Sequence, residues 1–249
     1  MYIIDRIEEN YERAMINTPA ERLSEYILMN LESVPEMTLT RLAYESDVSK
    51  GFVNKYISML TGMGSYAAFQ STLREEINCS AADHDIIMRE AGETAAKLTG
   101  TDPVSPQDIR MIAREIMRAE RTWIVGRRAY EGGMTFLIRS LRTEGIYVKY
   151  LTGAYLSAFP SETDWIGRND VVIILSPGTT VDEFQQKTTQ TFDLLEALKN
   201  RKVIFVGKDE GSSGMMSVVK TECGKGPYEE HNTAEWLALR LMEEIHRMH

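Results

Sequence analysis

The feature that most constrains this chain is a change of sequence period about halfway along it. Beyond that point, short apolar runs recur at residues 122–126, 146–150, 171–176 and 203–207, with a weaker run at 215–220. Stretches of helical length separate the stronger runs, and strands that alternate with helices predict βαβ units and a parallel sheet. Because crossovers between parallel strands are almost always right-handed, we expect a doubly wound, flavodoxin-like α/β domain with five parallel strands and helices on both faces.

The first half of the chain has helical periodicity. Apolar residues at helical spacing predict one helix from Ile3 to Tyr11 and another that opens at Pro19 and ends at Pro35. Thr18 stands where the hydroxyl of an N-cap residue would accept a backbone hydrogen bond. The organisation that we expect is an all-α domain, a helical linker and the α/β domain, over residues 1–78, 79–106 and 107–249.

Further helices are expected around and within the α/β domain. One opens at Ser105-Pro106 before the first strand, and one long helix over residues 181–199 follows the third strand. A last helix is predicted over residues 232–248. Residues 83–99 are expected to form a helix that connects the two domains.

The composition is that of a globular protein, with 43% hydrophobic residues among 249. The first residues include several acids and no long apolar run, and no stretch approaches the ~18 apolar residues of a membrane span, so we expect a cytoplasmic protein with no membrane partner. Cys79 and Cys223 lie far apart and lack metal-ligand spacing, and the chain has four histidines. We therefore predict no disulfide, no metal site and no cofactor.

The net charge of −9 at pH 7 argues against nucleic acid as a partner, because Lys and Arg contacts to phosphate dominate DNA affinity. The charge that matters, however, is the local charge of the segment that docks. Residues 48–60 contain Lys50 and Lys55 and no acid. A mildly basic element on an acidic body permits DNA binding and predicts modest nonspecific affinity.

Residues 38–62 have the pattern of a helix–turn–helix. A short helix that starts at Thr38 or Thr40 carries Ala43, whose small side chain lets two helix axes approach, and Val48 fills the corner of the turn. A second helix follows behind a Ser49 cap. The DNA contacts that we predict on and around its outward face are Thr38, Ser49, Lys50, Gly51, Phe52, Asn54 and Lys55. The alternative is an αα-hairpin within a helical bundle, which has the same pattern.

The loop after the third apolar run has the features of an anion site. Residues 176–180, Ser-Pro-Gly-Thr-Thr, leave a predicted parallel strand and enter a predicted helix. Backbone N–H groups at such a helix N-terminus, together with Ser and Thr hydroxyls, form a cradle for phosphate. Glu183, in the first turn of that helix, would either accept a ligand hydroxyl or complement the helix dipole.

Residues 1–77 resemble the N-terminal domain of RpiR-family regulators. The positions that match best are Ala43, Val48, Ser49 and Val53. Residues 60–66 depart from the compact tail of that domain. Lys55 stands where the family has an Arg in its recognition helix, and the two side chains are not equivalent in a bidentate contact to guanine. The resemblance therefore implies a DNA-binding regulator but leaves its operator undefined.

Residues 107–246 resemble the sugar isomerase (SIS) domain that follows in the same family, and residues 170–176 echo a strand motif of that domain. The resemblance implies a regulator of carbohydrate-metabolism genes whose partners are double-stranded operator DNA, a sugar phosphate and a second copy of the chain. It implies a homodimer, with a tetramer as the alternative. The ligand contacts predicted in the loops after the first and third strands are Gly126, Arg127, Arg128, Ser176, Gly178, Thr179, Thr180 and Glu183.

Both loops depart from the family pattern. The first, residues 126–132, is normally rich in Gly and Ser but here contains two arginines and a tyrosine, and the second has lost a Ser and gained Pro177. Arg127 and Arg128 could supply bidentate phosphate contacts in place of hydroxyls, whereas Arg128 and Tyr130 would crowd a sugar pocket. Three interpretations stay open: a sugar phosphate held by remodelled contacts, a different anionic metabolite, or a domain that has lost its ligand and serves only in dimerisation.

The competing class is a sugar-phosphate isomerase, which needs a general base near the reacting carbons of the sugar. Candidate bases are Glu183, Glu229, Glu230 and His231, the last placed just before the predicted final helix. A helical N-terminal domain has no role in such an enzyme, whereas its fusion to a ligand domain is the architecture of a sensor. We therefore predict a regulator without enzymatic activity, in which ligand binding changes the placement of the two domains and the spacing of the recognition helices.

Overall fold

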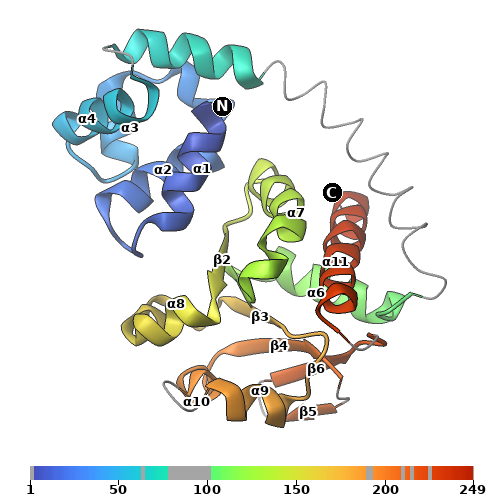
Figure 1. Cartoon of the computed structure of the whole chain (residues 1–249). Coiled ribbons are helices and arrows are strands. Elements are labelled where there is room, and N and C mark those ends of the chain that lie inside the picture. Colours follow the sequence, from blue (N-terminus) through green and yellow to red (C-terminus); the bar gives the residue numbers. More distant parts are fainter. Residues whose placement is uncertain are drawn as a thin grey trace. The chain divides into compact units, whose positions relative to one another are not determined.

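The computed structural model has two compact units, Met1–Met88 and Arg89–His249. It describes residues 3–62, 65–77, 102–188, 193–208, 211–213, 216–223 and 226–248 (Figure 1). The connecting helix predicted over residues 83–99, Cys79 and most of the predicted linker lie outside the described residues. Each unit has a hydrophobic core of its own.

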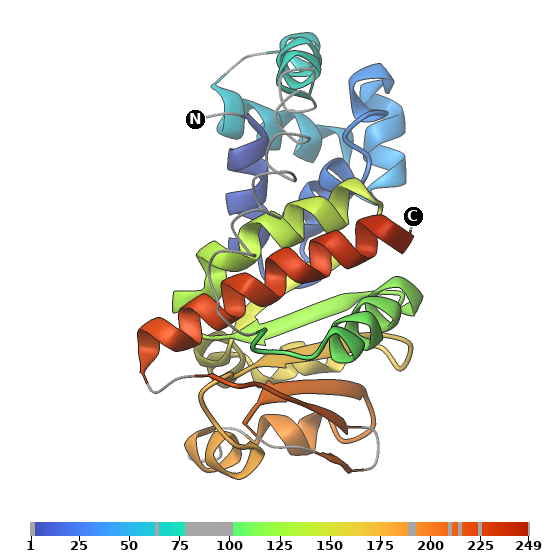
Figure 2. The same cartoon turned by 90° about the vertical axis from the view of Figure 1, so that its right-hand side faces the viewer.

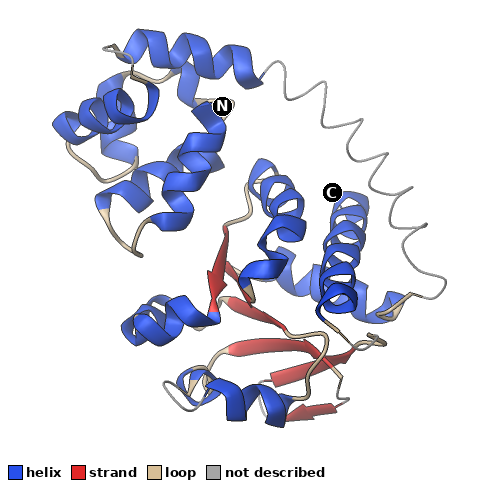
Figure 3. Ribbon diagram, viewed as in Figure 1, coloured by secondary structure: helices blue, strands red, loops and turns tan. Residues whose placement is uncertain are grey.

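The first unit is helical (Figure 3). Its elements are α1 (Ile3–Arg13), α2 (Pro19–Met29), the 3-10 turn η1 (Val34–Glu36), α3 (Leu39–Glu45), α4 (Lys50–Thr61) and a helix over residues 66–77. Apolar side chains from each of these elements fill the centre, among them Ile7, Leu23, Ile27, Val34, Leu42, Val53, Phe69 and Leu73. The apolar spacing read from the sequence therefore corresponds to the buried faces of the helices.

Hydroxyl caps fix where these helices begin, as predicted from the sequence. Thr18 and Ser49 each accept a hydrogen bond from the backbone N–H three residues later, at 3.3 and 3.1 Å. Thr38 rather than Thr40 caps α3, because its hydroxyl accepts from the N–H of Arg41 at 3.2 Å. Each cap satisfies an N–H group that has no partner inside the helix.

The second helix is shorter than the sequence predicts. It ends at Met29 instead of Pro35, because the N–H of Asn30 turns to the carbonyl of Ile27 at 3.2 Å. The side-chain amide of Asn30 also donates to the carbonyl of Tyr26 at 2.9 Å. A local side-chain bond of this kind competes with continuation of the helix, and Pro35 lies instead within η1.

Among the described residues, the second unit contains one six-stranded sheet in the order β2-β1-β3-β4-β6-β5. The strands are β1 (Thr122–Gly126), β2 (Val148–Thr152), β3 (Val171–Leu175), β4 (Lys202–Gly207), β5 (Gly211–Ser213) and β6 (Met216–Lys220). Five of them run parallel, which confirms the predicted five-stranded parallel sheet. The sixth, β5, pairs antiparallel with β6 at the edge and was not predicted.

Helices cover both faces of this sheet (Figures 1 and 2). On one face lie α6 (Pro106–Arg118), α7 (Glu131–Thr143) and α11 (Pro227–Met248). On the other lie α8 (Gly153–Ala158), α9 (Val181–Thr188) and α10 (Leu194–Ala197). Two 3-10 turns, η2 (Arg128–Tyr130) and η3 (Pro160–Trp165), complete the described elements of this unit. The arrangement is the doubly wound one that alternating strands and helices predict.

The strand β2 begins two residues later than the apolar run at 146–150 indicates. Gly145 ends α7 in the left-handed conformation, at φ 75°, and the N–H of Ile146 then bonds to the carbonyl of Leu141 at 2.8 Å. This Schellman arrangement uses the backbone of Ile146 to close the helix. Strand pairing therefore starts only at Val148.

Two helix predictions in this unit were wrong in extent. The single helix predicted over residues 181–199 is divided into α9 and α10, and Asp193 caps α10 by accepting a backbone hydrogen bond at 3.0 Å. Residues 189–192 between them lie outside the described part. The last helix begins at Pro227 rather than Asn232, because proline suits the first position of a helix, where its missing N–H costs nothing.

No helix in the described part of the chain is long and apolar enough to cross a membrane. Within the same residues, no three His, Cys, Asp or Glu side chains converge as metal ligands would.

Burial of the Tyr56 hydroxyl should lower the stability of the first unit at alkaline pH. Its buried hydroxyl hydrogen-bonds with that of Ser24, and burial raises the pKa of Tyr56 from 10.0 to about 12. Because the phenol of the unfolded chain ionises first, its contribution to stability is complete below pH 10.0 and is lost as the pH rises toward 12. Between these pH values the unfolding free energy of the wild type should fall by about 2 kcal/mol more than that of Tyr56→Phe, which has no phenol at this position to ionise.

Denaturant titrations at a series of pH values measure this difference. The matched control is Tyr44→Phe, because Tyr44 is 82% exposed and its ionisation should not be coupled to folding. Parallel pH profiles for the wild type and Tyr56→Phe would contradict the expected coupling.

Candidate functional site

The outward face of α4 carries most of the residues predicted to contact DNA. The exposed ones on this helix are Lys50, Gly51, Asn54 and Lys55. Thr38 and Ser49 are exposed as well, but their hydroxyls serve as the N-caps of α3 and α4. Phe52 is half-buried. The predicted contacts therefore divide into an exposed polar face and the capped starts of two helices.

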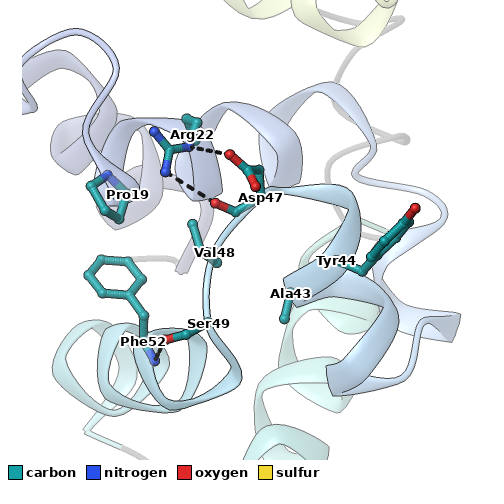
Figure 4. Close-up of a pocket in the computed structure, with 8 residues that line it drawn as sticks. All are labelled: Pro19, Arg22, Ala43, Tyr44, Asp47, Val48, Ser49 and Phe52. Atoms are coloured by element: carbon teal, nitrogen blue, oxygen red, sulfur yellow. Dashed lines mark hydrogen bonds and ion pairs between the residues drawn. The ribbon is translucent and has the colours of Figure 1, made fainter.

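An open groove of about 520 Å³ lies beside the turn between α3 and α4 (Figure 4). It is lined by Pro19, Arg22, Ala43, Tyr44, Asp47, Val48, Ser49 and Phe52. Arg22, from α2, donates to the backbone carbonyl of Asp47 at 3.1 Å and lies 3.7 Å from its carboxylate. This contact connects the turn to α2. The side chain of Asp47 is 92% exposed, so one acid precedes the helix face that carries the lysines.

In the second unit, the carboxyl ends of β1 and β3 lie side by side because the two strands pair in parallel. The loops that leave them carry the residues predicted to bind ligand: Gly126, Arg127 and Arg128 after β1, and Ser176, Gly178, Thr179, Thr180 and Glu183 after β3. Since β2 lies on the other side of β1, the strand order reverses between β1 and β3. Such a switch point is where doubly wound folds bind ligands.

The side chain of Glu230, from the first turn of α11, lies between these two loops. Its Oε2 accepts hydrogen bonds from Nη1 of Arg127 and from the hydroxyl of Tyr130, both at 2.7 Å. Its Oε1 lies so close to Gly178 that a Cβ added there would be only 1.9 Å away. The carboxylate, with its side chain 13% exposed, marks a position for an anion that both loops define. We refer to it as the anion position.

Glu230 was not among the ligand contacts predicted from the sequence, which treated it only as a candidate base. The predicted last helix began at Asn232, so that Glu230 was placed in a loop. The feature that could have located it is Gly226-Pro227, since a proline after a glycine favours a helix start. A helix that begins at Pro227 puts Glu230 in its first turn.

The hydroxyls predicted to cradle a phosphate are engaged within their own loop. Those of Ser176 and Thr179 are buried and hydrogen-bond to each other at 2.5 Å. Thr180 and Glu183 form a capping box at the start of α9, in which each side chain accepts a hydrogen bond from the other's backbone N–H, at 3.1 and 3.0 Å. Glu183 therefore stabilises the helix start, which was one of the two interpretations of this residue.

Two tyrosines hold the first loop. The hydroxyl of Tyr150 donates to the carbonyl of Arg127 at 2.6 Å, and a Cβ at Gly126 would come within 2.3 Å of that hydroxyl oxygen. Burial raises the pKa of both Tyr150 and Tyr130, and for Tyr130 the hydrogen bond to Glu230 raises it further. Both hydroxyls therefore remain protonated donors at neutral pH.

The candidate bases for an isomerase have separate surroundings. Glu183 belongs to the capping box and Glu230 to the ion pair with Arg127. His231 lies within α11 rather than before it as predicted, and its Nδ1 is 2.9 Å from the carbonyl oxygen of Ala129. Glu229 is exposed. Of these four residues, Glu230 lies between the two loops.

Cys223 is a free, half-buried thiol in the segment between β6 and α11. Burial raises the pKa of this thiol, and a hydrogen bond with Thr233 partly opposes the effect. A thiol held in the protonated form is a poor nucleophile, so Cys223 is assigned no role in the site.

No family model matches this chain, and no curated protein does. Among solved structures, it is similar to the NanR protein of Vibrio vulnificus complexed with ManNAc-6P, at 18% identity and a TM-score of 0.43, over 99% of this chain and 92% of that one. It is also similar to the C-terminal domain of glucosamine-fructose-6-phosphate aminotransferase from Francisella tularensis, at 14% identity and a TM-score of 0.43, over 83% and 53%.

A third similar structure is the sugar isomerase domain of an RpiR transcription factor from Sphaerobacter thermophilus, at 16% identity and a TM-score of 0.36, over 68% of this chain and 97% of that one. Similarities at these levels of identity and TM-score assign neither a family nor a ligand to the chain.

The contact between Gly178 and Glu230 can be tested by adding a methyl group. A Cβ at position 178 would lie 1.9 Å from Oε1 of Glu230, so Gly178→Ala should turn this side chain away from Arg127 and Tyr130 and lower the unfolding free energy of the second unit by about 1 kcal/mol. The matched control is Gly132→Ala, because nothing lies within 4 Å of a Cβ there, and alanine is the better helix former. Denaturant titrations compare the two variants.

In a Glu230→Ala background the penalty of Gly178→Ala should largely disappear, because the group that the new methyl meets is gone. This double-mutant cycle isolates the contact between the two residues. Additive effects of the two substitutions would show that the close approach is not a feature of the folded protein.

Proposed function

We propose that this protein is a cytoplasmic, DNA-binding transcriptional regulator that controls carbohydrate-metabolism genes in response to a sugar phosphate or a related anionic metabolite. The observation that carries the DNA-binding part is the exposed face of α4, where Lys50, Asn54 and Lys55 follow a capped turn. Ammonium and amide groups pair with phosphates and base edges in a major groove. The resemblance of residues 1–77 to the RpiR N-terminal domain supports the same role.

The local charge of this face suits a duplex despite the acidic chain. Its two lysines have no acid beside them within residues 48–60, and Arg22 lies 3.7 Å from the carboxylate of Asp47 at the preceding turn, which offsets that charge. Few phosphate contacts are available on so mildly basic a surface. Useful specificity would then require two half-sites bound by a homodimer or, as the alternative, a tetramer.

The anion position supports the ligand-binding part of the proposal. There Arg127 and Tyr130 direct hydrogen-bond donors at one carboxylate, and Gly178 leaves room for it. A guanidinium also pairs well with phosphate, because its planar donors match the phosphate oxygens. The phosphate group of a sugar phosphate is the ligand group that we assign to this position.

One observation favours a second candidate function. Because Glu230 fills the anion position, the second unit could serve in dimerisation alone, without any ligand. DNA binding would then be independent of sugar phosphates. An isomerase is less favoured, because a general base must be free to reach a substrate proton. Of the four candidate bases, Glu183 and Glu230 are engaged by protein groups and one ring nitrogen of His231 lies 2.9 Å from the carbonyl oxygen of Ala129, which leaves the exposed Glu229.

Lys55→Ala is expected to weaken binding to duplexes that the protein selects from a random-sequence pool. Loss of a base contact would cost about 1–3 kcal/mol in binding free energy. Loss of a phosphate contact would instead lower the slope of log affinity against log salt by about one. Fluorescence anisotropy titrations at several salt concentrations measure both quantities.

The matched control is Lys199→Ala, which removes the same charge from an exposed lysine of the second unit. Its affinity for the selected duplexes should equal that of the wild type. If the protein selects no duplex, or if the two substitutions weaken binding equally, the DNA-binding proposal fails whatever the second unit binds.

A further inference from the structure

The anion position is occupied by a carboxylate of the protein itself. Glu230 accepts hydrogen bonds from Arg127 and Tyr130 at 2.7 Å each, and its other carboxylate oxygen lies against Gly178. We propose that Glu230 is a resident competitor of the ligand, so that a phosphorylated ligand binds by displacing this carboxylate. The inference rests on the ligand-binding part of the proposed function and defines how that site is regulated.

A phosphate group and the Glu230 carboxylate cannot use this position together. Both need the Arg127 guanidinium and the Tyr130 hydroxyl as donors, and both are negatively charged. The side chain of Glu230 is 13% exposed, and like charges repel more strongly where water is largely excluded. The carboxylate must therefore leave before a phosphate makes the same contacts.

The ion pair is placed where exchange of partners is easy. The side chain of Arg127 is 52% exposed, so water can solvate its charge when the carboxylate leaves. Arg127 can therefore release the carboxylate and bind a phosphate without an unpaired buried charge in between. The backbone of Arg127 meanwhile stays fixed by the hydrogen bond from the Tyr150 hydroxyl.

Glu230 can leave without unfolding its helix. It lies in the first turn of α11, and its neighbours Tyr228 and Glu229 are exposed. Rotation of the side chain takes the carboxylate into solvent while it stays beside the helix N-terminus, whose partial positive charge favours an acid there. Displacement would break the hydrogen bonds that join the first turn of α11 to the loop after β1. Because α11 packs against α6 and α7, this is the route by which ligand binding would affect the rest of the unit.

The test compares Glu230→Gln with the wild-type chain. Glutamine has the same shape and keeps a carbonyl oxygen that accepts from Tyr130, but it carries no charge. Isothermal titration calorimetry with inorganic phosphate and with glucose 6-phosphate should give about tenfold tighter binding to the variant, because the wild-type site is open to ligand for only a fraction of the time. The matched control is Glu229→Gln, which removes the same charge from the adjacent exposed residue and should bind as the wild type does.

A second variant keeps the test independent of how well glutamine fits. Glu230→Ala leaves a gap of carboxylate size beside Arg127 and Tyr130. Acetate should bind in this gap and compete with inorganic phosphate, whereas acetate should not alter phosphate binding to the wild type. Circular dichroism checks that the helices are retained.

The phosphate affinities of these variants decide whether Glu230 competes with the ligand. Equal phosphate affinities for the wild type, Glu230→Gln and Glu229→Gln overturn the competition, and weaker binding to Glu230→Gln overturns it too, because Glu230 would then be a ligand contact. Retention of phosphate binding when Arg127→Ala is added to Glu230→Gln would place the ligand elsewhere. Absence of binding in every variant would overturn the ligand-binding part of the proposed function, whereas the duplex titrations test the regulator separately.

Discussion

The parallel pairing of β1 with β3 is the constraint on which the geometry of the second unit depends. The register pairs Thr122 with Val171 and Val125 with Ile174, so the chain leaves both strands at the same level of the sheet. The two loops therefore begin next to each other, although long stretches of sequence separate them. With β2 on the far side of β1, the crossover helices diverge and leave room at this edge.

The same pairing gathers hydrogen-bond donors and positive charge at this edge of the sheet. It brings together the Arg127 guanidinium and the Tyr130 hydroxyl, which both donate hydrogen bonds to a negative charge. The Arg127 side chain is 52% exposed and can be hydrated, but an anion beside it forms charge-assisted hydrogen bonds. The first turn of α11 supplies that anion through Glu230, so three separate segments of the chain meet at one carboxylate.

The sequence predicts the parts of the fold that rest on local patterns. The apolar runs locate β1, β3, β4 and β6 closely, and the hydroxyl caps at Thr18 and Ser49 locate the starts of α2 and α4. The strand β5 was missed because Gly-Ser-Ser has no hydrophobic pattern. The start of β2 was misplaced because a helix-ending motif at Gly145 takes over part of an apolar run.

The candidate site, like the fold, could be predicted from the sequence only in part. The loops after β1 and β3 follow from the order of strands and helices, so Arg127 and Gly178 were located correctly relative to the sheet. The contact of Arg127 with Glu230 could not be predicted, because it joins segments distant in sequence and depends on where α11 begins. The engagement of Ser176 with Thr179 was also unpredictable, since either hydroxyl could equally face a ligand.

The charged loop after β1 and the Glu230 carboxylate can be understood together. A site that holds phosphate through hydroxyls and backbone N–H groups is uncharged when empty and needs no counterion. In this protein Ser176 and Thr179 bond to each other, and Arg127 supplies a positive charge, so the site attracts an anion. Glu230 supplies this anion, and a ligand must bind Arg127 more strongly than Glu230 does in order to replace it. A neutral sugar gains nothing at Arg127, and a carboxylate only matches Glu230, whereas a phosphate monoester carries about −1.5 to −2 charges at pH 7 and is favoured in the exchange.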